Sequence, residues 1–282
     1  MGLLSQTKQL CALYNIVPSP LKDQHFLVGD TIFQKIVELG HLVHKDIVVE
    51  IGPGIGILTR ELAKKASKVI AIELDSSLQK ILEETLPQNV ELIFDNALDV
   101  LPQRKNFNKI VANIPYQICE PLFHYLCTAK KVELSVLMVP ISFAKIAQDN
   151  PIFSAFLDVK IITEVPAAAF FSPPKVISAV IVVIPKSNLN ELNNSEFIRQ
   201  KLYLQRDKKL KNGLRDTIID YYEWMKISKK KNKIAILKMT KKEADKIIDG
   251  FELSSILLEK TIAKLPLEEY GLLSELLQKV KL

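Results

Sequence analysis

Cysteine is scarce in this chain, which has only Cys11, Cys119 and Cys127 among its 282 residues. Their spacing matches none of the short cysteine patterns that bind zinc or iron–sulfur clusters, so we expect no metal site. So few cysteines suit a reducing cytoplasm, where a buried thiol packs as a small apolar group. Packing is therefore the role that we expect for all three.

Long apolar runs are also missing. No stretch approaches the roughly 20 consecutive apolar residues that cross a membrane, so we expect no membrane span. Residues 1–15 show no charged leader followed by a long apolar core and a small-residue cleavage site, which argues against secretion. The expected location is therefore the cytoplasm.

The composition is that of an ordinary globular protein, with 48% hydrophobic and 25% charged residues. The length allows one large core and a smaller second domain. Residues 1–185 contain 17 Lys and Arg against 18 Asp and Glu, a net charge of −1, whereas residues 186–282 contain 21 against 14, a net charge of +7. This basic C-terminal third suits a module that faces a polyanion such as nucleic acid, although such charge is more often only a solvated helix face.

Short apolar runs alternate with amphipathic segments from residue 47 to residue 184. The pattern predicts strands at 47–52, 68–74, 90–96, 109–114, 134–140, 159–165 and 178–184. Helices are expected at 57–66, 76–86, 118–129 and 142–149. Apolar strands that alternate with helices predict an α/β fold, with a largely parallel sheet covered on both faces. The last two strands have no helix between them, so we expect them to pair antiparallel at one edge.

The chain after Pro185 has a different pattern. Residues 187–195, SNLNELNNS, are polar and predict a linker. Apolar residues then recur at helical intervals in four segments, 196–205, 211–225, 241–251 and 268–280. The sequence therefore predicts two domains, an α/β domain at 1–185 and a smaller all-helical domain at 186–282.

A glycine-rich turn follows the first predicted strand and opens the first predicted helix. Its sequence is E-I-G-P-G-I-G, with glycines at 52, 54 and 56 after Glu50. Glycines in such a turn let the backbone approach a ligand closely. Glu50 is an acidic neighbour, which suits a cationic ligand better than a pyrophosphate, although this side chain would also brace the turn through hydrogen bonds.

Acidic residues end the next two predicted strands. Glu73 lies about twenty residues after the glycines, where a carboxylate takes both hydroxyls of a ribose. Asp95 and Asn96 end the third strand and are well placed for an adenine. S-adenosyl-L-methionine contains an ammonium, a sulfonium, a ribose and an adenine, and it fits this set of residues.

Four motifs in this order, E-I-G-P-G-I-G, I-E-L-D, F-D-N-A and N-I-P-Y, resemble those of amino-methylating S-adenosylmethionine enzymes. Q-H-F-L at 24–27 and F-F-S-P-P-K-V-I-S at 170–178 narrow the resemblance to the KsgA-like family of ribosomal RNA adenine dimethyltransferases. A weaker similarity continues at 206–212, where a basic stretch opens that family's helical domain.

The resemblance implies a Rossmann-like methyltransferase sheet with helices on both faces and a basic helical domain that recognises RNA. It also implies dimethylation of N6 on two adjacent adenosines near the 3′ end of small-subunit ribosomal RNA, within a pre-ribosomal particle and by a monomer. Two alternatives remain open. One is an adenine methyltransferase acting on large-subunit ribosomal RNA, and the other is a non-catalytic ribosome-assembly or nucleic-acid-binding factor.

The same resemblance implies a set of cofactor contacts. His25 and Leu27 would lie over the cofactor, Gly52 beneath its methionine part, and Asn113 where cofactor and target base meet. The full set of expected cofactor residues is His25, Leu27, Glu50, Gly52, Gly54, Gly56, Glu73, Asp95, Asn96 and Asn113. Four residues depart from the family pattern, namely His25, Asn96, Ser172 and Ile177.

The chemistry is expected at Asn113-Ile114-Pro115-Tyr116. The Asn113 side-chain oxygen and the Ile114 carbonyl would accept the two hydrogens of the adenine amine, while the fixed φ of Pro115 holds that carbonyl outward. Tyr116 would stack on one face of the base and Phe170 on the other. Taken alone, this motif is more often a turn, and a phenylalanine at 170 is more often core.

Three aromatic residues of the basic domain allow two interpretations. Tyr221, Tyr222 and Trp224 lie near basic residues, which would suit stacking on RNA. Their spacing fits the packed core of a helical domain at least as well.

Overall fold

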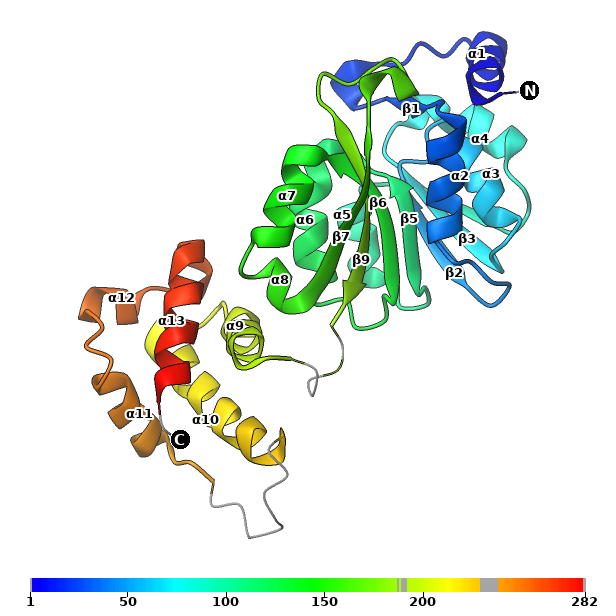
Figure 1. Ribbon diagram of the computed structural model, residues 1–282. Coiled ribbons are helices and arrows are strands. Elements are labelled where there is room, and N and C mark those ends of the chain that lie inside the picture. Colours follow the sequence, from blue (N-terminus) through cyan, green and yellow to red (C-terminus); the bar gives the residue numbers. More distant parts are fainter. Residues whose placement is uncertain (1, 187, 189–191, 229–237, 281–282) are drawn as a thin grey trace. The chain divides into compact units, whose positions relative to one another are not determined.

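One seven-stranded sheet forms the centre of the larger part of the molecule (Figure 1). The computed structural model describes residues 2–186, 188, 192–228 and 238–280. The strand order is β4-β3-β2-β5-β6-β9-β7. The strands are β2 (Ile47–Ile51), β3 (Lys68–Glu73), β4 (Val90–Phe94), β5 (Lys109–Asn113), β6 (Leu134–Pro140), β7 (Leu157–Val165) and β9 (Ser178–Pro185).

The pairing follows the pattern of the sequence. Strands β2 to β6 are parallel, β9 runs antiparallel to β6, and β7 pairs antiparallel with β9 at the edge. The predicted Rossmann-like α/β fold and its antiparallel edge pair are thus confirmed. The strand order reverses between β2 and β5, and ligands of open α/β sheets bind outside the carboxyl ends at such a point.

Helices cover both faces of the sheet, with α6 and α7 on one side and α2, α3 and α4 on the other (Figure 1). The predicted helix at 76–86 is divided into a 3-10 turn at Ser76–Leu78 and α4. The helices of this part are α1 (Leu3–Leu13), α2 (Asp30–Leu39), α3 (Ile57–Ala63), α4 (Gln79–Thr85), α5 (Ala97–Val100), α6 (Cys119–Leu126) and α7 (Ile141–Asp149). Among the described residues, no helix is long and apolar enough to span a membrane.

A second, two-stranded sheet was not predicted. In it β1 (Phe26–Leu27) pairs antiparallel with β8 (Phe170–Phe171), so that Phe26 lies opposite Phe171 and Leu27 opposite Phe170. The pairing brings together two motifs that are more than 140 residues apart in the sequence. Both therefore lie close to the carboxyl edge of the main sheet.

The second compact unit is helical and consists of residues 149–156 and 186–282. Residues 186–282 are those predicted for the second domain. The segment 149–156, with the short helix α8 (Phe153–Phe156), clusters with them although the sequence assigned it to the first domain. The other helices of this second unit are α9 (Asn194–Leu204), α10 (Leu210–Ser228), α11 (Lys241–Asp249), α12 (Ser255–Glu259) and α13 (Leu267–Lys279).

The predicted linker at 187–195 is shorter than expected. The side chain of Asn193 accepts a hydrogen bond from the Glu196 backbone and caps α9, so residues 194 and 195 belong to a helix. Residues 187 and 189–191 of this predicted linker lie outside the described residues.

Aromatic packing decides between the two interpretations of Tyr221. The ring centroids of Phe197 and Trp224 are 4.5 Å apart, and those of Phe197 and Tyr221 are 6.2 Å apart. Tyr221 is only 2% exposed. Its ring is therefore part of the core of the helical unit and is not a surface for stacking RNA. The Tyr222 ring instead makes a cation–π contact with the Lys226 ammonium, which lies 4.1 Å from the ring centroid.

Candidate active site

The glycine turn between β2 and α3 has the backbone that only glycine adopts easily. The φ angles of Gly52, Gly54 and Gly56 are 70°, 57° and 75°, all in the left-handed region. A Cβ at Gly54 would lie 3.0 Å from Cε1 of Phe26, a tight contact that would force the phenylalanine ring to move. The turn therefore needs glycine both for its shape and for the close approach of β1.

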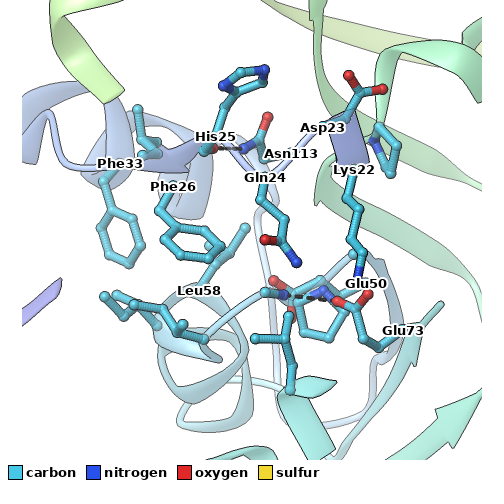
Figure 2. Close-up of a pocket in the computed structure, with 18 residues that line it drawn as sticks. Lys22, Asp23, Gln24, His25, Phe26, Phe33, Glu50, Leu58, Glu73 and Asn113 are labelled. Carbon is cyan, nitrogen blue, oxygen red and sulfur yellow. Dashed lines mark hydrogen bonds between the residues drawn. The ribbon is translucent and has the colours of Figure 1, made fainter. Parts of the chain in front are cut away.

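Two neighbouring hollows lie at the carboxyl edge of the sheet, between the glycine turn and residues 21–27. Figure 2 shows the first of them. The first measures about 720 Å³ and the second about 970 Å³. The first hollow is lined by eight of the residues predicted from the sequence, His25, Leu27, Glu50, Gly52, Gly54, Glu73, Asn113 and Pro115. The second is lined by Gly52, Glu73, Asp95, Asn96 and Pro115. Most of the predicted cofactor residues are thus brought together, whereas Gly56 lines neither hollow.

Glu73 holds the glycine turn through its carboxylate. Oε2 accepts a hydrogen bond from the Gly54 backbone N–H at 3.1 Å, and Oε1 accepts from the N–H groups of Leu74 and Asp75, both at 2.9 Å. The side chain is 7% exposed, and this burial raises the pKa of the carboxyl. One side chain thus fixes both the glycine turn and the loop that follows β3.

Asp75, at the end of I-E-L-D, fastens the segment that covers the hollows. Its Oδ2 accepts from the Lys22 ammonium at 2.9 Å and from Gln24 Nε2 at 2.7 Å. Figure 2 shows the side chains of Lys22 and Gln24 extending toward Glu50 and Glu73. The sequence analysis did not name Asp75 or Lys22 as site residues. The only signal for this contact was the acidic residue at the end of I-E-L-D, Asp75 itself.

Glu50 lies at the floor of the first hollow and is 2% exposed. Burial raises the pKa of its carboxyl to about 8, and the nearby charge of Glu73 acts in the same direction. Oε2 of Glu50 is buried without a hydrogen-bond partner among the described residues. Because Glu50 lines the first hollow, a cationic ligand group there would pair with this oxygen and favour the ionised carboxylate.

Asp95 and Asn96 differ in what they offer to a ligand. Asp95 is exposed at the rim of the second hollow, and its Oδ1 accepts from the Asn96 backbone at 2.7 Å. The Asn96 side-chain oxygen accepts from Leu98 N and caps α5. Asn96 therefore has a clear structural role as a helix cap.

Asn113 ends β5, and its amide orientation follows from its partner. Nδ2 donates to the His25 carbonyl at 2.9 Å, and because a carbonyl can only accept, the amide nitrogen must be on that side. Oδ1 is then left to accept from another group. The main-chain carbonyl of His25 thus sets the direction in which Asn113 presents its oxygen.

The His25 ring points away from Glu50 and Glu73 (Figure 2). Its Nδ1 lies 2.6 Å from the Ser172 carbonyl and must carry a proton to donate to it. The ring is stacked near Tyr116, with 6.3 Å between centroids and 29° between planes. Ser172 has a φ of 64°, so this departure from the family pattern lies at a left-handed turn.

Tyr116 follows Pro115 in a 3-10 turn, Tyr116–Ile118, and its hydroxyl is hydrogen-bonded to the Ser178 hydroxyl. Burial raises the pKa of the phenol. Ile114 is only 1% exposed and lines neither hollow. Asn-Ile-Pro-Tyr is a turn, as its composition suggests, and it begins at the edge of the first hollow.

Phe170 lies in β8, opposite Leu27 of β1. The side chain is 3% exposed and packs in the hydrophobic core, because β8 pairs with β1 and turns this residue inward. Its ring has no open face for a base in this structure. The predicted contact of Phe170 with the second face of the target base stays a prediction, and it would require this buried ring to become exposed.

Comparison with known proteins identifies the family. The sequence profile described as "Ribosomal RNA adenine dimethylase" matches residues 22–253. The chain belongs to this family. A relative from Pyrococcus abyssi, named "Probable ribosomal RNA small subunit methyltransferase A", is 35% identical over 219 residues, which are 74% of this chain and 80% of the relative. The relative of the same name from Methanococcus maripaludis is 34% identical over 271 residues, 90% of this chain and 95% of its own.

Solved structures agree with the dimethylase fold. A dimethyladenosine transferase from Plasmodium falciparum superposes with a TM-score of 0.55 at 25% identity, covering 88% of this chain and 96% of its own. The 23S rRNA methyltransferase ErmE has a TM-score of 0.52 at 19% identity, covering 90% of this chain and all of its own, which shows a shared fold alone.

The methyl donor of this dimethylase is S-adenosyl-L-methionine, and the residues present fit it. The unpartnered Glu50 oxygen suits an ammonium group. The buried Glu73 and the exposed Asp95, at the ends of β3 and β4, suit ribose hydroxyls and an adenine edge. Gly52 and Gly54 leave room for the ligand against the backbone.

Glu50 makes the stability of the dimethylase depend on pH. A carboxyl with a pKa near 4.5 when unfolded and about 8 when folded holds its proton longer in the folded state. The free energy of unfolding therefore falls as pH rises from 4.5 to 8. Glu50→Gln removes this component, so relative to wild type the variant gains at least roughly 2 kcal/mol between pH 5 and pH 9 in urea unfolding.

The exposed Glu38→Gln serves as the matched control. Its stability relative to wild type should be the same at pH 5, 7 and 9. A Glu50→Gln profile parallel to that of Glu38→Gln would contradict a buried carboxyl of raised pKa.

Gly54→Ala tests the glycine turn. The new Cβ meets the Phe26 ring at 3.0 Å in a left-handed backbone, so the turn and its bond to Glu73 must shift. We expect at least a tenfold loss of affinity for S-adenosylhomocysteine in calorimetric titration. Gly271→Ala is the control, because nothing lies within 4 Å of its Cβ, and it should bind like wild type. Equal affinities for the two variants would rule out the close-approach role of Gly54.

Proposed function

We propose that this chain transfers methyl groups from S-adenosyl-L-methionine to N6 of two adjacent adenosines near the 3′ end of small-subunit ribosomal RNA, forming N6-dimethyladenosine during ribosome biogenesis. The relatives at 34–35% identity are named small-subunit methyltransferases, and the Plasmodium structure is a dimethyladenosine transferase. The observation that carries the proposal is the Asn113 amide, which is fixed by His25 with its oxygen available at the edge of the cofactor hollow.

The chemistry has to overcome a poor nucleophile. The lone pair of an adenine N6 is delocalised into the ring, and acceptors for its two hydrogens favour a pyramidal nitrogen whose lone pair is free to react. Asn113 Oδ1 and the Ile114 carbonyl are the two acceptors. S-adenosyl-L-methionine supplies the methyl group on a sulfonium. The chain then contributes alignment and electrostatic stabilisation, without a covalent intermediate.

Tyr116 holds the target base. A base within RNA must leave its stack to reach such a site, and an aromatic ring replaces part of the lost stacking. The bond between the Tyr116 and Ser178 hydroxyls fixes the tyrosine ring. Its raised pKa keeps the phenol neutral, so that it acts as a surface and not as a base.

The partner that we propose is small-subunit ribosomal RNA within a pre-ribosomal particle, bound by a monomer in the cytoplasm. The residues after 185 carry a net charge of +7, which supports recognition of RNA phosphates by the helical unit. Neither alternative has an observation in its favour. The likeness to ErmE concerns the fold alone, and intact Glu50, Glu73 and Asn113 support retained chemistry.

Asn113→Ala tests the acceptor role. Because the amide oxygen is lost at the reacting amine, we expect methyl transfer to fall at least 100-fold, while RNA binding by filter retention stays within about threefold of wild type. Glu120→Ala, at an exposed nearby position that lines neither hollow, is the control and should keep full turnover. Unchanged turnover in Asn113→Ala would exclude the mechanism.

Transfer of a radiolabelled methyl group to unmethylated small subunits tests the function itself. We expect label in N6-dimethyladenosine, approaching two modified adenosines and four methyl groups per subunit, and none in large subunits. A different labelled nucleoside, or labelling of large-subunit RNA alone, would overturn the proposed function.

A further inference from the structure

Four exposed lysines surround an open hollow of about 780 Å³ at the edge of the sheet opposite the active site. Lys45 precedes β2, Lys105 precedes β5, and Lys130 and Lys131 precede β6. Because β2, β5 and β6 are parallel, the segments before them meet at the amino edge. The cofactor hollows lie at the carboxyl edge, so these lysines have no part in the site described above.

The four ammonium groups have no acidic partner within the described parts of the chain, whereas other lysines of the same unit do. Lys22 pairs with Asp75 at 2.9 Å, and Lys68 pairs with Glu91 at 2.7 Å. The acids closest to the hollow are already engaged. Asp46 is 2.9 Å from Lys109, and Glu133 accepts from Asn108 at 3.2 Å. The hollow thus has four positive charges against the single carboxylate of Glu133.

A buried ion pair holds the loops that carry these lysines. Lys109 is 8% exposed and Asp46 is 1% exposed. Besides Asp46, the Lys109 ammonium donates to the carbonyls of Gly40 at 3.1 Å and His41 at 2.7 Å. The loop before β2, which includes Lys45, is therefore fixed to the start of β5.

Asn108 extends this network to the third loop. Its Nδ2 donates to Asp46 at 2.9 Å, its Oδ1 accepts from the Ile47 backbone at 3.1 Å, and its own carbonyl accepts from the Glu133 N–H at 2.8 Å. The catalytic chemistry uses none of these contacts. Their effect is to hold three lysine-bearing loops in one arrangement, which lowers the ordering cost of binding a ligand.

We propose that Lys45, Lys105, Lys130 and Lys131 form a lysine platform that binds phosphate groups of folded ribosomal RNA, as a second contact separate from the target adenosines. The inference rests on the proposed function for the identity of the RNA. Lysines act as point charges on phosphates, and a concave surface with four unpaired cations matches a backbone of regularly spaced anions. The ring of Phe107 at this hollow is 5% exposed, so the hollow offers no aromatic ring for insertion between bases or into a membrane.

The distance between the two edges gives the platform a function in substrate choice. The seven residues of β6 at roughly 3.3 Å per residue separate them by roughly 20 Å. A short RNA that carries only the target adenosines occupies the carboxyl edge alone. Folded RNA of an assembling subunit reaches both edges and gains affinity from the second contact.

The test compares two variants of the full chain that lose equal charge. The platform variant is Lys45→Gln, Lys105→Gln, Lys130→Gln and Lys131→Gln. The control variant changes four other exposed lysines of the same unit, Lys8→Gln, Lys65→Gln, Lys80→Gln and Lys145→Gln. Thermal unfolding establishes that both fold, and Lys130→Glu with Lys131→Glu provides an independent platform variant.

Binding to unmethylated small subunits is measured from 50 to 300 mM KCl. We expect the platform variant to lose at least tenfold in affinity at 100 mM and to reduce the slope of log K against log salt by about three. The control should stay within about threefold of wild type. Affinity for S-adenosylhomocysteine, and turnover on a short RNA that carries the target adenosines, should not change in either variant.

The platform proposal is overturned if both variants lose affinity for small subunits equally, or if neither variant loses affinity. Binding to phosphatidylglycerol vesicles is measured as well. If the platform variant binds subunits like wild type and loses affinity only for these vesicles, the lysines belong to a membrane surface and the platform is overturned. The proposed function fails separately, if the wild-type chain binds subunits through these lysines but forms no N6-dimethyladenosine. Normal dimethylation with unchanged binding and salt slope in the platform variant defeats the inference and leaves the function standing.

Discussion

The Glu73 carboxylate is the constraint on which the active site depends. It ends β3, is almost fully buried, and receives three backbone N–H groups, one from the glycine turn and two from the loop after β3. The same loop presents Asp75 to Lys22 and Gln24, which brings the covering segment over both hollows. That segment places the His25 carbonyl against Asn113. One acidic side chain thus connects the glycine turn to Asn113, the residue that we propose to receive the target amine.

This connection explains why three separated motifs act as one site. I-E-L-D supplies the carboxylates, the segment from 22 to 25 supplies cover, and the Asn113 amide takes its direction from a main-chain carbonyl. The lysine platform lies at the other edge and is held by its own buried pair, Lys109 and Asp46. Binding of the cofactor and binding of distant RNA are therefore supported by independent networks within one domain.

Much of the fold and about half of the candidate site can be predicted from the sequence, because these features follow from patterns of neighbouring residues. Apolar strands, glycines at 52 and 54 and acidic strand ends are patterns of adjacent residues. The pairing of β1 with β8 is not such a pattern, since it involves two residues on each side and buries Phe170, which the family motif alone placed at the base. Asp75 and the segment 149–156 were missed for the same reason: their roles come from contacts between distant parts of the chain.

Hydrogen–deuterium exchange of the full chain and its Glu73→Gln variant tests this central role most directly. Replacing one carboxylate oxygen by an amide NH₂ removes the acceptor of the Gly54 N–H or that of the Leu74 and Asp75 N–H groups. It also sets a donor against a donor there, which loosens the whole contact. We predict faster exchange at these three amides and, through Asp75, across residues 22–25, with no change around Lys109 at the opposite edge. Unchanged exchange at Gly54 and residues 22–25 would contradict the account, because the glycine turn and the covering segment would then be held without Glu73.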